Sequence, residues 1–316
     1  MMLSICVTFA NQNKYINRAI DSIIKMMGKE TDYEIIVGLD NPDLNAERLV
    51  DAFKNQSRLS TYVLHSDARF ISLSRAAMNR AFLLEQAKGK YAMILDGDDF
   101  YIDSPVEAIE FLEQNPNYSG YGHCFKRFNE STDSFTKWKP PYKHLEDIHL
   151  DRHLRENKYI HSNCIVFRKE LLADNPAVYC NDTALTCYLL SKGLIKFSHK
   201  EIMGYTVGIP SIYAGASATL KCLSAFVMLE EMMQHHTKYK KYFYKKMYKV
   251  IRKFGHQTKN DAPNEYGFQV IERNLPITKY LYESCNGTSL RRLIRILCLR
   301  TYLFYMSFFG SIKPNK

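Results

Sequence analysis

Short apolar runs alternate with helical patterns through the first hundred residues, and this alternation restricts the folds open to the chain. Four runs carry the β-branched and aromatic side chains typical of buried strands. They are residues 3–10, 33–39, 61–65 and 91–95. The segments between them repeat apolar side chains at helical spacing, at residues 15–27, 45–54 and 73–87. This order predicts an α/β fold with right-handed crossovers, in which helices flank a mainly parallel central sheet.

Three carboxylates follow the fourth predicted strand within four positions, in the sequence Asp96-Gly97-Asp98-Asp99. Open α/β sheets bind their ligands at the carboxyl ends of the strands. Asp96 and Asp98 are two residues apart, so on a continued strand they would point to the same side. Carboxylates that lie close together repel each other, and a hard divalent cation relieves that repulsion while it shares substrate phosphates. The cluster therefore predicts a metal–diphosphate site.

Two other interpretations of the cluster need no diphosphate. Asp and Gly are ordinary residues of a polar turn, which accounts for one or two acids after a strand but poorly for three. Asp96, Asp98 and Glu107 also have the spacing of an EF-hand loop. However, Phe100 and Tyr101 stand where that loop needs a ligand and a glycine, and a predicted strand precedes it instead of a helix. We therefore favour the metal–diphosphate interpretation.

The composition narrows the class of protein. The chain has 316 residues, 46% of them apolar, which is enough for one large domain with an appendage or for two small domains. Its 8 cysteines are scattered without a CxxC pair, which argues against a zinc site or a disulfide scaffold and fits a reducing cytoplasm. No signal peptide and no charge-free stretch of about twenty apolar residues is visible. The predicted location is cytoplasmic.

The whole chain has a formal net charge of +10. Basic and apolar residues dominate its last third. Residues 238–253 interleave lysine with tyrosine and phenylalanine and contain no acid, and residues 290–312 mix arginine with long apolar side chains. We therefore expect two domains, residues 1–215 and a basic helical region of residues 216–316. That region could lie peripherally on the cytoplasmic face of an anionic membrane, pack on the first domain, or form an oligomer contact.

Asp40 ends the second predicted strand as Asp96 ends the fourth, so both are expected at the same edge of the sheet. A carboxylate at this place commonly binds the ribose or base of a nucleotide, although an Asx turn before Pro42 fits the local sequence equally well. Neither a GxGxxG nor a GxxxxGK[ST] motif follows the first strand. Their absence from the sequence lowers both the dinucleotide-binding and the P-loop interpretations.

The order and spacing of several segments resemble glycosyltransferase family 2, whose members have the nucleotide-sugar-binding GT-A fold. The similarity extends to its bacterial cell-surface polysaccharide type. The matching segments are Ser4 to Phe9, Asn11, the helix with Ala19 and Ser22, Glu34 to Val37, Asp40, Ser74 to Asn79, and residues 87–99. Three places depart from the family pattern. Leu39 stands where the second strand usually has a further Asp, and the loop that follows, Asn41-Pro42-Asp43, lacks the common Gly-Ser. Met78 replaces an Arg for which Arg75, on the same helical face, could substitute.

The resemblance implies a nucleotide-sugar site, a metal and a catalytic base. Its donor-binding residues would be Thr8, Phe9, Asn11, Asp40, Arg75, Asn79, Asp96, Gly97 and Asp98. Asp98 and Asp99 would hold Mn²⁺ or Mg²⁺, with His161 as a further candidate whose alternative is a packed or solvated side chain. Asp182 matches the Asp of the family's usual Glu-Asp pair and would be the base, although it also suits a helix N-terminus.

These expectations together describe an inverting glycosyltransferase that moves a sugar from a nucleotide-diphosphate donor, expected to be a UDP-sugar, to a hydroxyl acceptor. The acceptor would be a cell-surface glycan or a lipid-linked saccharide. A nucleotidyltransferase would also use carboxylates and metal, but it usually has a Gly- and Arg-rich loop where this chain has Asn11-Gln12-Asn13-Lys14. A non-catalytic nucleic-acid-binding module would depend on the basic aromatic residues 238–253. We expect no nucleic-acid partner.

Overall fold

The computed structural model divides the chain into two compact units. One consists of Met1–Ser66 with Ala76–Ile209, and the other of Asp67–Arg75 with Pro210–Lys316. The structure describes residues 2–10, 13–29, 31–40, 43–53, 58–64, 72–142, 145–156, 160–172, 182–209, 217–254, 257, 275–285 and 289–309. The domain boundary predicted between residues 215 and 216 lies outside the described residues.

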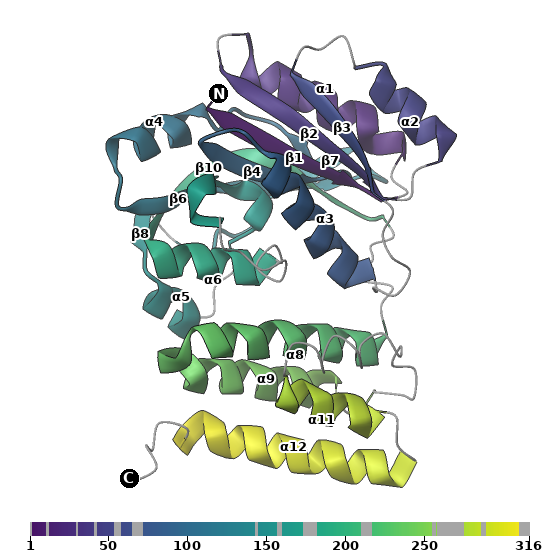
Figure 1. Cartoon of the computed structure of the whole chain (residues 1–316), viewed down its shortest axis with the longest axis vertical. Helices are drawn as coiled ribbons and strands as arrows, with labels where there is room; N and C mark the ends of the chain where they lie inside the picture. Colours follow the sequence, from purple (N-terminus) through teal and green to yellow (C-terminus); the bar gives the residue numbers. More distant parts are fainter. Residues whose placement is uncertain are drawn as a thin grey trace. The chain divides into compact units, whose positions relative to one another are not determined.

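A central sheet organises the first unit (Figure 1). Its strands are β1 (Leu3–Phe9), β2 (Tyr33–Asp40), β3 (Leu59–Leu64), β4 (Tyr91–Asp96), β5 (Phe100–Tyr101), β6 (Tyr118–Asn129), β7 (Ser134–Thr136), β8 (Glu146–Ile148), β9 (Ile165–Arg168) and β10 (Leu194–Val207). Within the described residues the order is β3-β2-β1-β4-β9-β6-β10-β5, with β7 beside β6 and β8 beside β10.

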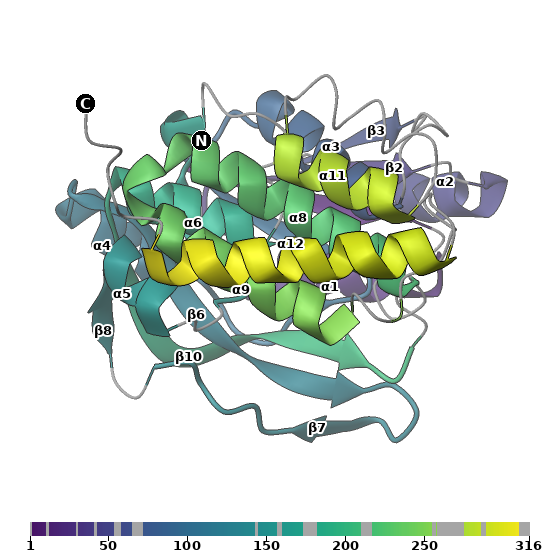
Figure 2. The same ribbon diagram turned by 90° about the horizontal axis from the view of Figure 1, so that it is seen from below.

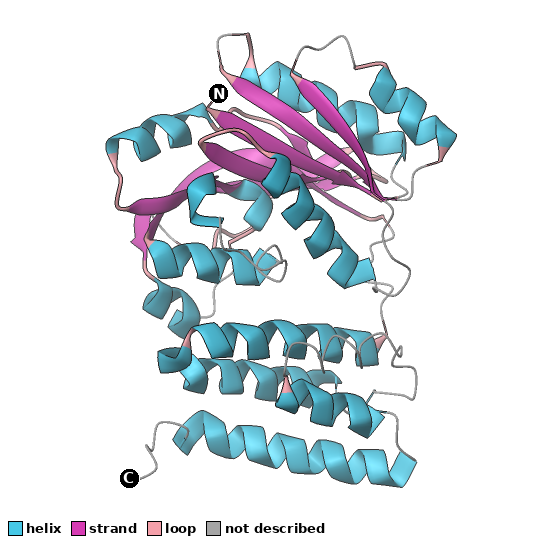
Figure 3. Cartoon of the chain, viewed as in Figure 1, coloured by secondary structure: helices cyan, strands magenta, loops and turns pink. Residues whose placement is uncertain are grey.

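Helices and short 3-10 turns connect these strands (Figure 3). They are η1 (Asn13–Tyr15), α1 (Ile16–Met27), α2 (Leu44–Asp51), α3 (Ser72–Gln86), α4 (Val106–Gln114), α5 (Leu150–Glu156), η2 (Ser162–Cys164), η3 (Lys169–Leu172) and α6 (Asp182–Lys192). Each strand and helix predicted in the first hundred residues is present, with its ends shifted by up to three residues. The expected α/β class is confirmed.

The four strands β3, β2, β1 and β4 are parallel, as the sequence predicts. Beyond β4 the sheet is mixed, because β9 runs antiparallel to both β4 and β6 while β6 and β10 run parallel. The sequence predicts a continuous strand over residues 159–168, but the structure begins this strand only at Ile165. Ser162–Cys164 instead form a 3-10 turn, which places a polar side chain, Asn163, inside the first unit.

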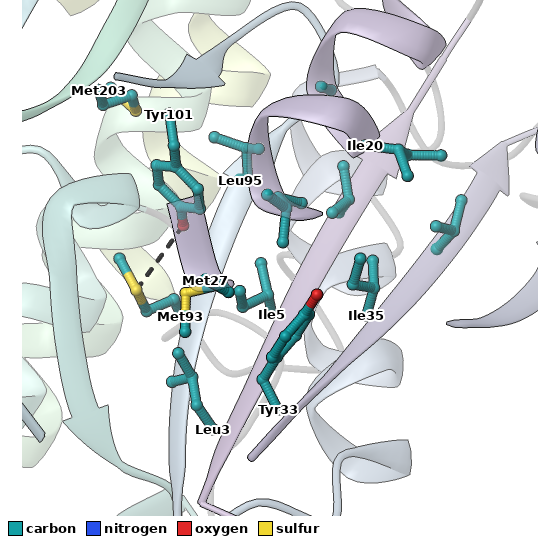
Figure 4. Packing of buried hydrophobic residues seen from close by; sticks show 14 of the residues in the cluster. Leu3, Ile5, Ile20, Met27, Tyr33, Ile35, Met93, Leu95, Tyr101 and Met203 are labelled. Carbon is teal, nitrogen blue, oxygen red and sulfur yellow. Dashed lines mark hydrogen bonds between the residues drawn. The ribbon is translucent and has the colours of Figure 1, made fainter. Parts of the chain in front are cut away.

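One face of the parallel strands packs on α1 and α4 (Figure 4). Alternate residues of β1, among them Leu3 and Ile5, join Ile20 of α1 in a buried cluster that also contains Met93 and Leu95 of β4. Each large apolar side chain buried in this way contributes about 1.5–3 kcal/mol relative to exposure. The alternate apolar side chains of the strands and the apolar face of α1 are therefore buried in one core.

A polar contact fixes the edge of the sheet where β4 begins. The Ser4 hydroxyl donates to Glu34 Oε1 at 2.6 Å and accepts from the Gly89 N–H at 2.7 Å. The same Glu34 oxygen accepts from the Lys88 N–H at 2.6 Å. A Cβ at Gly89 would lie 2.6 Å from the Ser4 nitrogen, so only glycine allows this approach. The segment after α3 is thereby tied to β1 and β2, which sets where β4 starts and where it ends.

The second unit is helical, and its described helices are α8 (Ala218–His235), α9 (Lys240–Phe254), α11 (Pro276–Cys285) and α12 (Ser289–Phe309). A short 3-10 turn, η5 (Thr237–Tyr239), joins α8 to α9. Helix α9 packs on both α8 and α12, and α11 packs on α8 and α12 (Figure 2). None of the helices in the described ranges is both long and apolar enough to cross a bilayer.

Candidate functional site

Residues 96–99, which we call the acid turn, follow directly from the carboxyl end of β4. Asp96 is the last residue of the strand and lies opposite Thr8 of β1 in the parallel register. The Asp99 N–H donates to the Asp96 carbonyl at 2.9 Å, which closes a turn over Gly97 and Asp98. Because the strand stops at Asp96, the expectation that Asp96 and Asp98 point alike as residues of one strand is wrong.

Gly97 brings the acid turn against the end of β1. Its N–H donates to the Thr8 carbonyl at 2.8 Å. A Cβ at this position would lie 2.1 Å from Phe9 Cδ1 and 2.7 Å from the Thr8 carbonyl oxygen, so no side chain fits. The structure therefore places three of the predicted donor-binding residues, Thr8, Phe9 and Gly97, in contact.

Asp96 forms an ion pair that the sequence interpretation missed. Arg80 Nη2 of α3 lies 2.5 Å from Asp96 Oδ1, and the Arg80 side chain is largely buried. The sequence points to Arg75 of the same helix, whose side chain lies outside the described residues. Arg80 lies five residues further along α3 and so on a different face of the helix from Arg75, but it directly follows the predicted donor-binding residue Asn79.

Asp99 is buried and engaged through both carboxylate oxygens. Oδ1 accepts from the Thr206 N–H at 2.9 Å, and Oδ2 accepts from Asn163 Nδ2 at 3.3 Å. Burial, followed by the charges of Asp98 and Asp96, raises the pKa of Asp99 well above its usual range. These contacts anchor the acid turn to β10 and η2. The prediction that Asp99 binds metal stays a prediction.

Asp98 is held through its backbone and leaves its carboxylate available. Its carbonyl accepts from Arg18 Nη2 at 2.8 Å and from the Thr206 hydroxyl at 2.5 Å. Within the described ranges, no side chain donates a hydrogen bond to the Asp98 carboxylate or pairs with it. Burial, followed by the Asp96 charge, raises the pKa of Asp98 to about 6. A largely buried carboxylate that resists carrying its charge alone is suited to a cation.

Arg18 of α1 connects the acid turn to several elements. Its guanidinium donates to Thr206 Oγ1 at 3.0 Å and pairs with Glu130 Oε2 at 2.9 Å. It also lies 4.6 Å from the Phe100 ring centroid and 5.3 Å from that of Phe128. Aromatic rings on a guanidinium restrict its rotation and contribute cation–π attraction. Arg18 could not be selected from the sequence, because its partners Phe128, Glu130 and Thr206 are far away along the chain.

We expect Thr206→Val to loosen the acid turn. The substitution keeps the shape and the backbone N–H that binds Asp99, and it removes the hydroxyl that donates to the Asp98 carbonyl and accepts from Arg18. Loss of these two hydrogen bonds should lower the free energy of unfolding by about 1–3 kcal/mol, measured by denaturant titration. The matched control is Thr136→Val on β7, an exposed position where the change should stay within about 0.5 kcal/mol. Equal effects at the two sites would contradict the anchoring role of Thr206.

The remaining predicted residues are placed as follows. Asp40 is the last residue of β2, and Asn79 lies in α3; both are partly buried. Asn11 and the Asp182 side chain fall outside the described residues, although Asp182 itself begins α6. The β2 and β4 ends thus lie at the same edge of the parallel sheet, as expected from their order.

His161 lies inside the first unit and not in solvent. Its Nδ1 accepts from the Asn163 N–H at 3.4 Å, and its ring packs against Phe125 and Tyr205, with centroids 5.3 Å and 5.1 Å away. Trp138 stacks on Phe125 with centroids 4.4 Å apart. Tyr205 immediately precedes Thr206, so this aromatic cluster adjoins the anchor of the acid turn. His161 as a metal ligand stays a prediction.

Oxygen ligands are sparse around the acid turn. Among the described side chains, no group of three His, Cys, Asp or Glu residues is placed to hold a metal ion together. A site with one or two protein carboxylates is typical of Mg²⁺ that is bound jointly with substrate phosphates and water. The chemistry of the donors therefore fits a divalent cation that arrives with a diphosphate, and does not fit a cage built from protein side chains alone.

Comparison with known proteins also indicates a glycosyltransferase. The family model described as Glycosyl transferase family 2 matches residues 4–175, more than half of the chain. "Uncharacterized glycosyltransferase MG060" of Mycoplasma genitalium is 22% identical over 149 residues, which cover 45% of this chain and 49% of the relative. "Uncharacterized glycosyltransferase MJ1057" of Methanocaldococcus jannaschii is 24% identical over 155 residues, 48% of this chain and 51% of the relative. The chain thus spans about half the length of these curated relatives.

Solved structures share the fold. S. aureus TarS 1-349 in complex with UDP is similar with a TM-score of 0.63 at 16% identity, over 99% of this chain and 93% of that chain. The same fragment in complex with UDP-GlcNAc is similar with a TM-score of 0.57 at 16% identity and the same coverage. At this identity the likeness concerns the fold, and it confirms the expected GT-A type.

Proposed function

Because this chain belongs to glycosyltransferase family 2, we propose that it transfers a sugar from a nucleotide-diphosphate donor to a hydroxyl acceptor with inversion at the anomeric carbon. The observation that carries the proposal is the acid turn at the carboxyl end of β4, where Asp98 presents a carboxylate that no described side chain binds. A UDP-sugar is the proposed donor, and its support is the fold shared with a TarS fragment that binds UDP and UDP-GlcNAc.

We assign the donor to the edge of the sheet where β1, β2 and β4 end. Asp40 at the end of β2 would orient the nucleoside, and Asn79 with the residues around Gly97 would line the diphosphate. Asp96 pairs with Arg80, so its carboxylate is held in place and can accept hydrogen bonds from the ribose. The ion pair also keeps a positive charge close to where the diphosphate would lie, which favours the leaving group electrostatically.

Asp98 is the residue that we propose as the protein ligand of Mn²⁺ or Mg²⁺. When bound, the cation would act as a Lewis acid that neutralises the negative charge of the departing diphosphate. Arg18 and Thr206 hold the Asp98 carbonyl, so the turn that carries the carboxylate is fixed before the donor arrives. Asp99 accepts hydrogen bonds from Thr206 and Asn163. We propose that Asp99 positions Asp98 and does not itself bind the cation.

Asp182, at the first position of α6, is the proposed general base. It would remove the acceptor hydroxyl proton as that oxygen attacks the face of the sugar opposite the diphosphate. Trp138 and Tyr205, which are partly exposed and pack on the buried Phe125, offer ring surfaces of the kind that pack against sugars. We propose a cell-surface glycan or a lipid-linked saccharide as acceptor, and a peripheral location at a membrane would suit such a substrate.

The test is a screen of nucleotide sugars for hydrolysis and transfer, in which release of the nucleoside diphosphate is measured with Mn²⁺, with Mg²⁺ and with EDTA. We expect one UDP-sugar to be consumed, with UDP as product and with loss of turnover in EDTA. Release of pyrophosphate from nucleoside triphosphates would indicate a nucleotidyltransferase instead. Steeply salt-dependent binding to generic DNA or RNA without any turnover would indicate the nucleic-acid-binding alternative.

A further inference from the structure

The excess positive charge of this protein belongs to the second unit. Residues 210–316 contain 18 lysines and arginines against 6 acidic residues, a net charge of +12. The whole chain has a net charge of +10, so residues 1–209 together carry a net charge of −2. The first unit, which contains the proposed donor site, is therefore close to neutral. An anionic partner would therefore be attracted mainly to the second unit, which contains the helices α8 to α12.

Helix α9 concentrates this charge on one face. Its opposite face is buried and consists of Phe243, Tyr244, Met247 and Ile251. The exposed face presents a continuous basic stripe: Lys241, Lys245, Lys249, Arg252 and Lys253. The helix contains no acidic residue that could neutralise the stripe from within. Two aromatic side chains of α9, Phe243 and Tyr244, are buried and therefore cannot stack on the bases of a single-stranded nucleic acid.

Helix α12 exposes an apolar face instead. At 3.6 residues per turn, seven exposed side chains form one continuous arc of roughly 160°. They are Ile294, Leu297, Cys298, Thr301, Tyr302, Phe304 and Tyr305, and none is charged. Leu297 is 58% exposed and Ile294 53%. Of the ten exposed large apolar side chains in the described part of the chain, five belong to this one helix.

The basic stripe and the apolar arc share an edge. Tyr248 lies beside the stripe on α9 and packs against Phe304, at one margin of the arc, with centroids 5.5 Å apart. The opposite face of α12 is buried through Ile296, Leu299 and Leu303. Arg295 and Arg300 are partly exposed and lie where the buried face meets the arc, one on each side. If the arc were inserted into an apolar phase, both arginine side chains could therefore extend away from it.

We propose that the stripe on α9 and the arc on α12 form one docking surface for an anionic lipid bilayer. Helix α12 would lie in the plane of the interface, with Ile294, Leu297 and Tyr305 among the acyl chains. Arg295 and Arg300 would reach the headgroups alongside their apolar neighbours, and the α9 lysines would contact anionic lipids. A second copy of the chain fits this surface less well, because its own basic stripe would be brought against the first.

The exposed arc contains its own reporter. Among the cysteines in the described ranges, only Cys298 is exposed, and it lies within the arc. In a Cys180→Ser background, Cys298 of the full chain is labelled with an environment-sensitive fluorophore, and peptide mapping verifies the position. Vesicles of phosphatidylcholine alone are compared with vesicles that contain phosphatidylglycerol. We expect the emission to shift to the blue and gain intensity only with anionic vesicles, and high salt to reverse the effect in part.

Two pairs of variants separate the charge from the apolar arc, and both are measured by vesicle flotation. Lys245→Gln with Lys249→Gln should weaken binding to anionic vesicles by about 25-fold, since each basic residue contributes about fivefold. Ile294→Ser with Leu297→Ser should weaken it by about tenfold or more. The matched controls lie in the first unit: Lys29→Gln with Lys192→Gln, and Val63→Ser with Leu145→Ser. All of these positions are exposed, and the controls should bind as the unmodified chain does.

Several outcomes would overturn the proposal. The labelled chain could fail to respond to anionic vesicles at low salt, or the control variants could lose as much binding as the α9 and α12 variants. A blue shift that grows with protein concentration in the absence of vesicles, together with a doubled mass in solution, would assign the arc to contact between copies. None of these readouts involves sugar transfer, so they stand or fall independently of the proposed enzymatic activity.

Discussion

Asp98→Ala is expected to reduce sugar transfer severely while the protein stays folded. The substitution removes a carboxylate that has no partner among the described side chains, and it leaves untouched the Asp98 carbonyl that Arg18 and Thr206 bind. If the carboxylate holds the cation, its loss removes several kcal/mol of stabilisation from the departing diphosphate. That corresponds to a fall in kcat of about a hundredfold to a thousandfold. Binding of Mn²⁺ in the presence of UDP, measured by calorimetry, should fall with it.

The matched control for this prediction is Glu110→Gln on α4, which removes an exposed carboxylate of the same unit that lies away from the acid turn. Its activity and its Mn²⁺ affinity should equal those of the unmodified protein. The thermal unfolding midpoint of Asp98→Ala should not fall, because relief of the repulsion with Asp96 offsets the small loss of packing. Full activity with unchanged metal dependence in Asp98→Ala would mean that residues 96–99 are only a polar turn.

The strands and helices of the first hundred residues could be predicted because their local patterns agree with the tertiary structure. Tyr91–Leu95 is apolar on both faces, and the structure buries it between β1 and β9. The end of β4 could also be predicted from the change to acidic residues. In contrast, Ser162–Cys164 before β9 form a 3-10 turn, from which Asn163 donates to Asp99. No local pattern records such a contact across 64 residues.

The residues of the acid turn are neighbours along the chain, whereas the residues that hold it are not. Asp96, Gly97 and Asp98 are adjacent in sequence, so their spacing alone was informative. Arg18 and Thr206 meet the turn only through the order of strands in the sheet, over separations of 80 and 108 residues. Both residues donate to the backbone carbonyl of Asp98. Every residue has such a carbonyl, so the amino-acid sequence does not indicate which one is bound.

The acid turn also shows why three acids occur where one could serve. Asp96 pairs with Arg80, Asp99 is anchored by Thr206 and Asn163, and only Asp98 keeps an available carboxylate. Two of the three therefore fix the geometry of the third. A carboxylate held in this way loses little conformational freedom when a cation arrives, which favours binding by preorganisation.

Asp182→Asn is expected to reduce kcat by about a hundredfold or more, because an amide cannot accept the acceptor's proton. The KM for the donor should stay close to its original value, since the proposed base faces the acceptor. The free energy of unfolding should fall by less than about 1 kcal/mol, because Asp182 is the first residue of α6 and asparagine loses only the attraction of the charge to the helix N-terminus. Steady-state kinetics at saturating donor, with thermal unfolding measured in parallel, would separate these quantities.

The control must distinguish a catalytic base from a carboxylate that merely stabilises the start of a helix. Asp151 lies in the first turn of α5, is exposed, and pairs with Arg155 at 3.5 Å. Asp151→Asn therefore removes a charge from the same turn of another helix and should leave kcat unchanged. A fall in donor affinity as large as the fall in kcat for Asp182→Asn would place this residue at the donor. If Asp182→Asn lowered both kcat and the thermal unfolding midpoint, Asp182 would be a residue that stabilises α6 and not the base.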